Sequence, residues 1–149
     1  MKYVLAVASL LGISASIRAD APHKAADVVH YRQDIMGVIG WNFAPMGAMV
    51  KNKTTWDPAA FAMRAERLQF LSTQVLEGFP NASTGGVETD AKADIWNNFD
   101  DFKSKLSDLI AEAKTLNETA KTGDETKMKD QFKKTAEACK ACHEKYKAS

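Results

Sequence analysis

Apolar residues recur at intervals of three and four in four stretches of the chain, which is the period of an amphipathic α-helix. The stretches cover residues 25–51, 57–79, 90–116 and 124–146. The positions that set the period include Val29, Met36, Ile39 and Phe43 in the first stretch, Phe61, Leu68 and Val75 in the second, Ile95, Phe102 and Leu109 in the third, and Met128, Phe132 and Tyr146 in the fourth. No stretch alternates strictly enough to predict a β-strand.

The residues at the ends of these stretches support the same interpretation. Asp57 is a good N-cap and Pro58 suits the first helical position, while Gly123 can end one helix just before Asp124 caps the next. Within the first helix we expect a kink or close packing near its glycines and proline, Gly37, Gly40, Pro45 and Gly47. Four amphipathic helices, two of them joined by a very short turn, predict an all-α fold, an antiparallel up-down four-helix bundle.

The first residues have the pattern of a secretory signal peptide. Lys2 is followed by an apolar run from Tyr3 to Ile13 and then by small residues, and this run is too short to span a bilayer. We place the cleavage after Ala19, so that residues 1–19 are removed and residues 20–149 form the mature domain. No later apolar run approaches the length of a membrane helix. The sequence therefore predicts an exported, soluble protein with no membrane partner.

The charge of the mature domain points away from nucleic acid as a partner. Lys2 and Arg18 belong to the predicted signal peptide, so 18 of the 20 basic residues remain against 19 acidic ones. The mature chain therefore has no overall basic field that would attract a polyanion. Its apolar fraction of 45% and charged fraction of 26% are ordinary for a globular domain.

The candidate chemistry lies in the last helix, where Cys139, Cys142 and His143 stand at i, i+3 and i+4 and so share one helix face. A disulfide at this spacing would close a tiny loop and remove little unfolded-state entropy. A zinc ion needs three or four ligands, and the only other histidines are His23 and His30. A thioredoxin-like redox pair would need a βαβ context, which the pattern does not predict.

The remaining role is the attachment of haem. C-x-x-C-H is the signature of c-type haem, in which two thiols form thioethers with the porphyrin vinyl groups and the imidazole ligates the iron. We therefore predict one covalent haem c on Cys139 and Cys142, with His143 as an axial ligand.

The first helix carries candidate partners for the haem. Arg32 and Gln33 lie where the pattern turns inward, and an arginine fork suits the carboxylate of a propionate, although a solvated surface arginine is the alternative. Met36 follows one turn later and could face the iron opposite His143, or it could simply fill the core. For the aromatic residues on the inner faces of the last two helices, core packing is the expectation: Trp96, Phe99 and Phe132.

Three segments resemble the cytochrome c′ family, the class II c-type cytochromes: "YRQDIM", "ETDAKADIW" and "CKACHEKY". The position of the haem motif near the C-terminus is the specific part, because class I cytochromes c carry theirs near the N-terminus. The resemblance implies a bacterial, periplasmic protein. It also implies which residues contact the haem: Cys139 and Cys142 (thioethers), His143 (proximal ligand), Arg32 and Gln33 (propionates), Asp90 with Thr89 (a polar contact before the third helix) and Met36 (distal position).

One position departs from the family pattern. Many members carry arginine four residues beyond the ligand histidine, whereas this chain has Lys147 there. Lysine keeps the positive charge but lacks the planar fork of the guanidinium.

The function depends on the sixth coordination position. If Met36 only covers the iron, the haem is five-coordinate and high-spin and binds nitric oxide or carbon monoxide, with electron transfer to redox partner proteins as a further activity. If the Met36 sulfur bonds to the iron, the chain is a low-spin electron carrier of the cytochrome c-556 type. A cofactor-free helical interaction module in the periplasm is the alternative from another class.

Other expectations concern catalysis and assembly. We expect no enzyme, because the sequence shows no paired carboxylates in a loop, no Ser-His-Asp order and no phosphate cradle, and His143 is committed to iron. The resemblance also implies a homodimer, for which apolar residues of the first helix such as Trp41 or Met49 are candidates.

Overall fold

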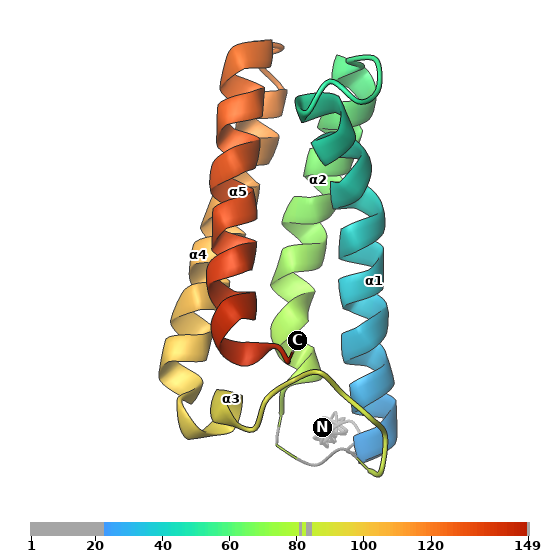
Figure 1. Cartoon of the computed structure of the whole chain (residues 1–149), viewed down its shortest axis with the longest axis vertical. Coiled ribbons are helices and arrows are strands. Elements are labelled where there is room, and N and C mark those ends of the chain that lie inside the picture. Colours follow the sequence, from blue (N-terminus) through green and yellow to red (C-terminus); the bar gives the residue numbers. More distant parts are fainter. Residues whose placement is uncertain (1–22, 81, 83–84, 149) are drawn as a thin grey trace, which may run out of the picture.

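The computed structural model describes residues 23–80, 82 and 85–148, and its long helices form one antiparallel bundle (Figure 1). The four long helices are α1 (Ala25–Val50), α2 (Pro58–Gln74), α4 (Phe99–Ala120) and α5 (Glu125–Tyr146). A 3₁₀ turn, η1 (Val75–Gly78), extends α2, and a single turn, α3 (Asp94–Asn97), precedes α4. The predicted all-α up-down four-helix bundle is confirmed. The predicted signal peptide, residues 1–19, lies outside the described residues.

Two of the helix starts follow the predicted capping chemistry. The Asp57 side chain accepts a 2.9 Å hydrogen bond from the Ala60 backbone N–H, with Pro58 in the first helical position. The Asp124 side chain accepts a 3.1 Å bond from the Lys127 N–H. Gly123 just before it has φ of +71°, a left-handed conformation that glycine adopts at little cost. These caps set the register of α2 and α5.

Helix α1 continues through Pro45, and close packing occurs at Gly47. A Cβ atom at Gly47 would lie only 3.3 Å from the ring of Phe132 in α5. One turn earlier, Phe43 stacks on Phe132 with the ring centroids 4.3 Å apart. The missing side chain therefore lets α1 and α5 approach each other at this end of the bundle.

The third helical stretch begins later than predicted. Residues near Asp90 are not helical, α3 begins only at Asp94, and Asn98 (φ −130°, ψ 43°) separates α3 from α4. The physical reason is tertiary: Ala91 pairs with Lys147 in an isolated antiparallel bridge, and the Lys92 N–H donates to the Tyr146 carbonyl at 2.9 Å. These bonds hold the segment extended where its period alone predicts helix.

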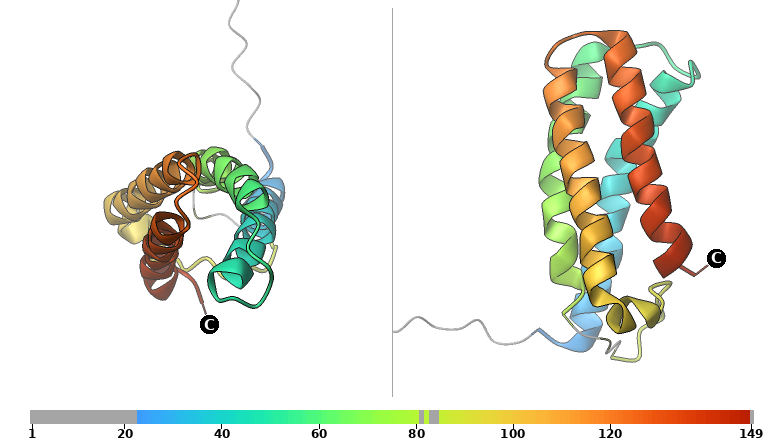
Figure 2. Two further views of the ribbon diagram at one scale, coloured as in Figure 1. Left: turned by 90° about the horizontal axis from the view of Figure 1, so that it is seen from above. Right: turned by 90° about the vertical axis from the view of Figure 1, so that its left-hand side faces the viewer.

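The four helices surround a common interior, seen end-on in Figure 2. At the end of the bundle near the α4–α5 turn this interior is filled by apolar side chains that are almost completely buried, among them Phe61, Met46, Leu116 and Met128. Towards the opposite end, where α1 begins and α5 ends, the interior opens into a cavity. Among the described residues no helix combines the length and apolarity needed to cross a membrane.

Truncation of Phe132 tests how much the closed end of the bundle contributes to stability. Its ring is 6% exposed, stacks on Phe43 and meets Phe61 edge-on. We expect Phe132→Ala to lower the free energy of unfolding by about 3–5 kcal/mol, measured by urea denaturation with circular dichroism. Phe70→Ala is the matched control, because that ring is 66% exposed, and it should change the free energy by less than about 0.5 kcal/mol. Equal losses for both variants would contradict the described core.

Candidate functional site

A cavity at the end of the bundle where α1 begins and α5 ends has a volume of about 730 Å³, within the range of small-molecule and cofactor sites. A smaller cavity of about 50 Å³ adjoins it, since Met36, Phe102, Cys142 and His143 line both. Seven of the eight residues predicted from the sequence line the larger cavity: Arg32, Gln33, Met36, Thr89, Asp90, Cys142 and His143. The eighth, Cys139, lines the smaller one. The fold thus brings together residues from α1, α5 and the segment before α3.

The two cysteines lie on the inner face of α5 as half-buried free thiols. Burial raises the pKa of the Cys139 thiol to about 11, and the charge of Cys142 adds to this shift. Burial also raises the pKa of Cys142. Both groups therefore stay protonated at neutral pH, unlike the low-pKa thiolates of redox sites. Within the described parts of the chain, no three His, Cys, Asp or Glu side chains gather closely enough to hold a metal ion.

The imidazole of His143 opens onto both cavities one helical position beyond Cys142. Partial burial lowers its pKa, and the positive charge of Lys147 lowers it further. The ring is therefore neutral at pH 7, which is the form that ligates a metal. From α1, Met36 lines the same two cavities, so that a thioether and an imidazole face one space from two different helices.

Arg32 is a buried cation with an unused donor. The side chain is only 4% exposed, which excludes the solvated surface arginine considered as an alternative. Its Nε donates to the Gly78 carbonyl at 2.8 Å and Nη1 donates to Thr89 Oγ1 at 3.3 Å, but Nη2 is buried without a hydrogen-bond partner. Burial lowers the pKa of Arg32. An unpaired buried N–H is costly, so this corner of the cavity is suited to a carboxylate.

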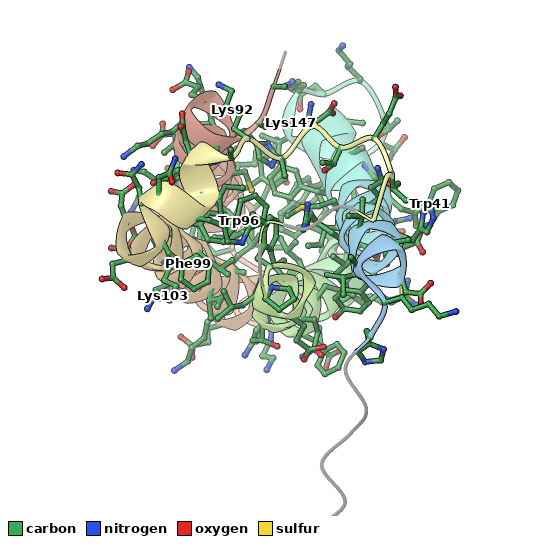
Figure 3. All side chains as sticks on the ribbon, turned by 90° about the horizontal axis from the view of Figure 1, so that it is seen from below. Trp41, Lys92, Trp96, Phe99, Lys103 and Lys147 are labelled. Atoms are coloured by element: carbon green, nitrogen blue, oxygen red, sulfur yellow. The ribbon has the colours of Figure 1, made fainter. Side chains whose placement is uncertain are left out.

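Two aromatic rings pack against the guanidinium of Arg32. The Arg32 Cζ lies 4.4 Å from the centroid of Phe79 and 5.4 Å from that of Trp96. Trp96 points into the bundle from α3 (Figure 3) and packs on Phe79 at 6.2 Å. Phe79 was not among the site residues predicted from the sequence. Its place in the apolar period of the second stretch was the only available signal.

The remaining predicted residues make contacts within the protein. Gln33 Nε2 donates to the Glu88 carbonyl at 2.9 Å, and Thr89 Oγ1 accepts from both Arg32 and the Ala91 N–H. The Asp90 carboxylate pairs with Lys147 Nζ at 3.0 Å. Thr89 and Asp90 thus lie at the cavity with their polar groups already engaged. Tyr146 also lines the cavity, and its hydroxyl donates to the Asp101 carboxylate.

The sequence and the fold both match known proteins. Residues 27–147 match the family described as Cytochrome C'. A cytochrome c′ of Halomonas halodenitrificans is 35% identical over 127 residues, which are 82% of this chain and 96% of that protein. The structure of cytochrome c prime from Shewanella frigidimarina superposes with a TM-score of 0.82 at 38% identity, covering 87% of this chain and 100% of that one. A nitric oxide complex of a cytochrome c prime variant from Alcaligenes xylosoxidans gives 0.78 at 29%, covering 87% and 99%.

The residues around the cavity fit the cofactor of this family, a covalently bound haem c. Two thiols and an imidazole share one face of α5, and the unpartnered Nη2 of Arg32 lies where a propionate carboxylate would satisfy it. The predicted cofactor and the predicted resemblance are both confirmed by the match over most of the chain. The protein belongs to the cytochrome c′ family.

Proposed function

We propose that this protein is a periplasmic haem c protein that binds nitric oxide or carbon monoxide and carries electrons. The observation that carries the proposal is the cavity in which His143 and Met36 approach from different helices. A variant of a cytochrome c prime, which belongs to the same family, has been obtained as a nitric oxide complex. When bound, the haem iron supplies the coordination site for a diatomic gas and the electron that is exchanged.

Each residue has a defined role in this proposal. Cys139 and Cys142 would form the thioethers with the haem, and His143 would supply a nitrogen ligand to its iron. Arg32 would hold a propionate through Nη2, which has no partner among the described residues. Gln33 fixes the segment before α3 through the Glu88 carbonyl. We assign no catalytic role to His143 or Asp90, since His143 serves the iron in this proposal and Asp90 is paired with Lys147.

The distal side is apolar, which favours small uncharged ligands. Besides Met36, the inner cavity is lined by Ile39, Val75, Leu106 and Leu109, together with the charged side chain of Lys105. A cation would lose its hydration there without compensation, whereas nitric oxide and carbon monoxide lose little. A gas ligand would also have to displace Met36, so its affinity includes the cost of that rearrangement. The second candidate, a low-spin electron carrier, rests on the same Met36 thioether, which is a competent axial ligand.

Substitution of Met36 separates the two candidates. We expect the oxidised wild-type protein to be high-spin and to remain so in Met36→Leu. Met36→Ala should speed nitric oxide association about tenfold if moving the methionine costs about 1.4 kcal/mol. Absorbance and stopped-flow mixing measure both effects. Met128→Leu, a change in the buried core, is the control and should alter neither. A low-spin wild type that becomes high-spin in Met36→Leu would instead establish the electron carrier.

Intact mass tests covalent attachment and export together. The protein matured with c-type machinery should carry one haem-sized mass increment that survives acidified acetone, and its chain should begin at Asp20. The Cys139→Ser/Cys142→Ser variant should show the polypeptide mass alone, because no thioether can form. Wild-type protein with no increment would favour the cofactor-free interaction module, and a retained N-terminus would overturn the proposed signal peptide.

We also propose that a second copy of the chain docks on the outer face of α1. Trp41 is 77% exposed and Val38 46% exposed, and Trp41 projects away from the bundle in Figure 3. Large apolar side chains that are this exposed are typical of interfaces. Met49, the other candidate from the sequence, is 5% exposed and therefore belongs to the core of the monomer.

Analytical ultracentrifugation tests the dimer. Wild-type protein should sediment as a dimer and Trp41→Glu as a monomer, because burying an unpaired carboxylate at the interface is costly. Ser104→Glu on α4 makes the same change of charge at an exposed position and should leave the dimer intact. A monomeric wild type at micromolar concentration would contradict this part of the proposal.

A further inference from the structure

Residues 87–93, which we call the strap, run between the beginning of α1 and the end of α5 just before α3 (Figure 1). Four strap residues line the large cavity: Glu88, Thr89, Asp90 and Ala91. The same end of the cavity contains Arg32, the proposed propionate partner. The strap therefore forms part of the wall at the polar end of the haem pocket.

On one side the strap is fixed to the helix that carries Met36. Gln33 Nε2 donates to the Glu88 carbonyl at 2.9 Å. Arg32 Nη1 donates to Thr89 Oγ1 at 3.3 Å, and Thr89 Oγ1 also accepts from the Ala91 N–H at 3.2 Å. These contacts come from neighbouring positions on α1 and hold the first half of the strap.

On the other side the strap is fixed to the end of α5. The Lys92 N–H donates to the Tyr146 carbonyl at 2.9 Å, and the Ala148 N–H donates to the Asp90 carbonyl at 2.7 Å. Between these two bonds, Lys147 Nζ pairs with the Asp90 carboxylate at 3.0 Å. The Lys147 N–H in turn donates to the His143 carbonyl at 3.0 Å. The chain directly beyond the ligand histidine thus holds the strap, and Figure 3 shows Lys92 and Lys147 close together at this point.

The ion pair is the element of this junction that can be changed without altering the backbone. Its side chains are 49% and 66% exposed, so the attraction is modest and is screened by salt. One partner lies on the strap and the other at the end of α5. Even a modest attraction between them therefore favours the closed position of the strap.

We propose that Asp90 and Lys147 form a latch that holds the strap against the polar end of the haem pocket and so limits the access of water to the haem. The two side chains are positioning residues. Asp90 acts through Lys147, in place of the direct porphyrin contact that the family resemblance implies. Water that enters when the strap opens favours the more highly charged ferric state, so opening the latch lowers the reduction potential.

Two charge-removing variants of the haem-loaded protein test the latch by hydrogen exchange. Asp90→Asn and Lys147→Gln each remove one charge; asparagine keeps the shape of aspartate, and glutamine is a neutral, somewhat shorter replacement for lysine. We expect both to speed exchange of the Lys92 amide about two- to fivefold, the range that corresponds to an exposed ion pair. Added salt should speed this exchange in the wild type and have little effect in the variants.

The reduction potential distinguishes a latch from the direct effect of the charges. Charge alone predicts opposite shifts, because loss of a carboxylate raises the potential and loss of an ammonium lowers it. The latch predicts that both variants lower the potential. It also predicts that the exchanged pair, Asp90→Lys with Lys147→Asp, restores both the potential and the amide protection towards wild type.

Lys140→Gln is the matched control, because Lys140 pairs within α5 at 3.4 Å with Glu144, a carboxylate as exposed as Asp90. It should leave the exchange of the Lys92 amide unchanged. Opposite shifts of the potential, or unchanged exchange in both single variants, would overturn the latch. This outcome is separate from the proposed function: a preparation without haem would contradict the function, whereas unchanged exchange of the Lys92 amide in haem-loaded variants would contradict the latch alone.

Discussion

The buried guanidinium of Arg32 joins the segments that surround the cavity. One side chain on α1 donates to the Gly78 carbonyl at the end of η1 and to Thr89 on the strap, while the faces of Phe79 and Trp96 support it. Two of its donors are satisfied by the protein, and Nη2 has no hydrogen-bond partner among the described residues, which suits the proposed contact with a propionate. A cation that is 4% exposed is costly without an anion, so the arrangement favours the haem-bound protein over the free chain.

Most of the fold could be predicted from the sequence because its signals are local. The 3.6-residue period identifies four helices, and the side chains of Asp57 and Asp124 fix two of their starts by bonding to backbone N–H groups three residues ahead. The start of the third helix could not be predicted in this way. Residues near Asp90 have a helical period, but bonds to Tyr146 and Ala148, which are distant in sequence, hold them extended. No local pattern records such a pairing.

The site shows the same division between local and tertiary information. Cys139, Cys142 and His143 could be predicted from their spacing, since three positions within one turn of a helix must share a face. The phase of Arg32 and Met36 on α1 indicates an inward position but leaves a surface arginine and a core methionine open; their roles at the haem are implied by the family resemblance. The contact of Phe79 with Arg32 and the pairing of Lys147 with Asp90 could not be predicted, because they depend on how η1 and the strap pack against the helices.

The two ends of the bundle differ in how closely their helices pack. At one end, Gly47 lets α1 approach α5, and Phe43, Phe61 and Phe132 fill the interior. At the other end the helices stand apart to leave a cavity, and the rings of Phe79, Phe102 and Tyr146 pack along one side of it. On the side of the strap the wall is held by backbone hydrogen bonds and a partly exposed ion pair. Contacts of this kind open at lower free energy than a packed core, so we expect local opening of the cavity wall to begin at the strap.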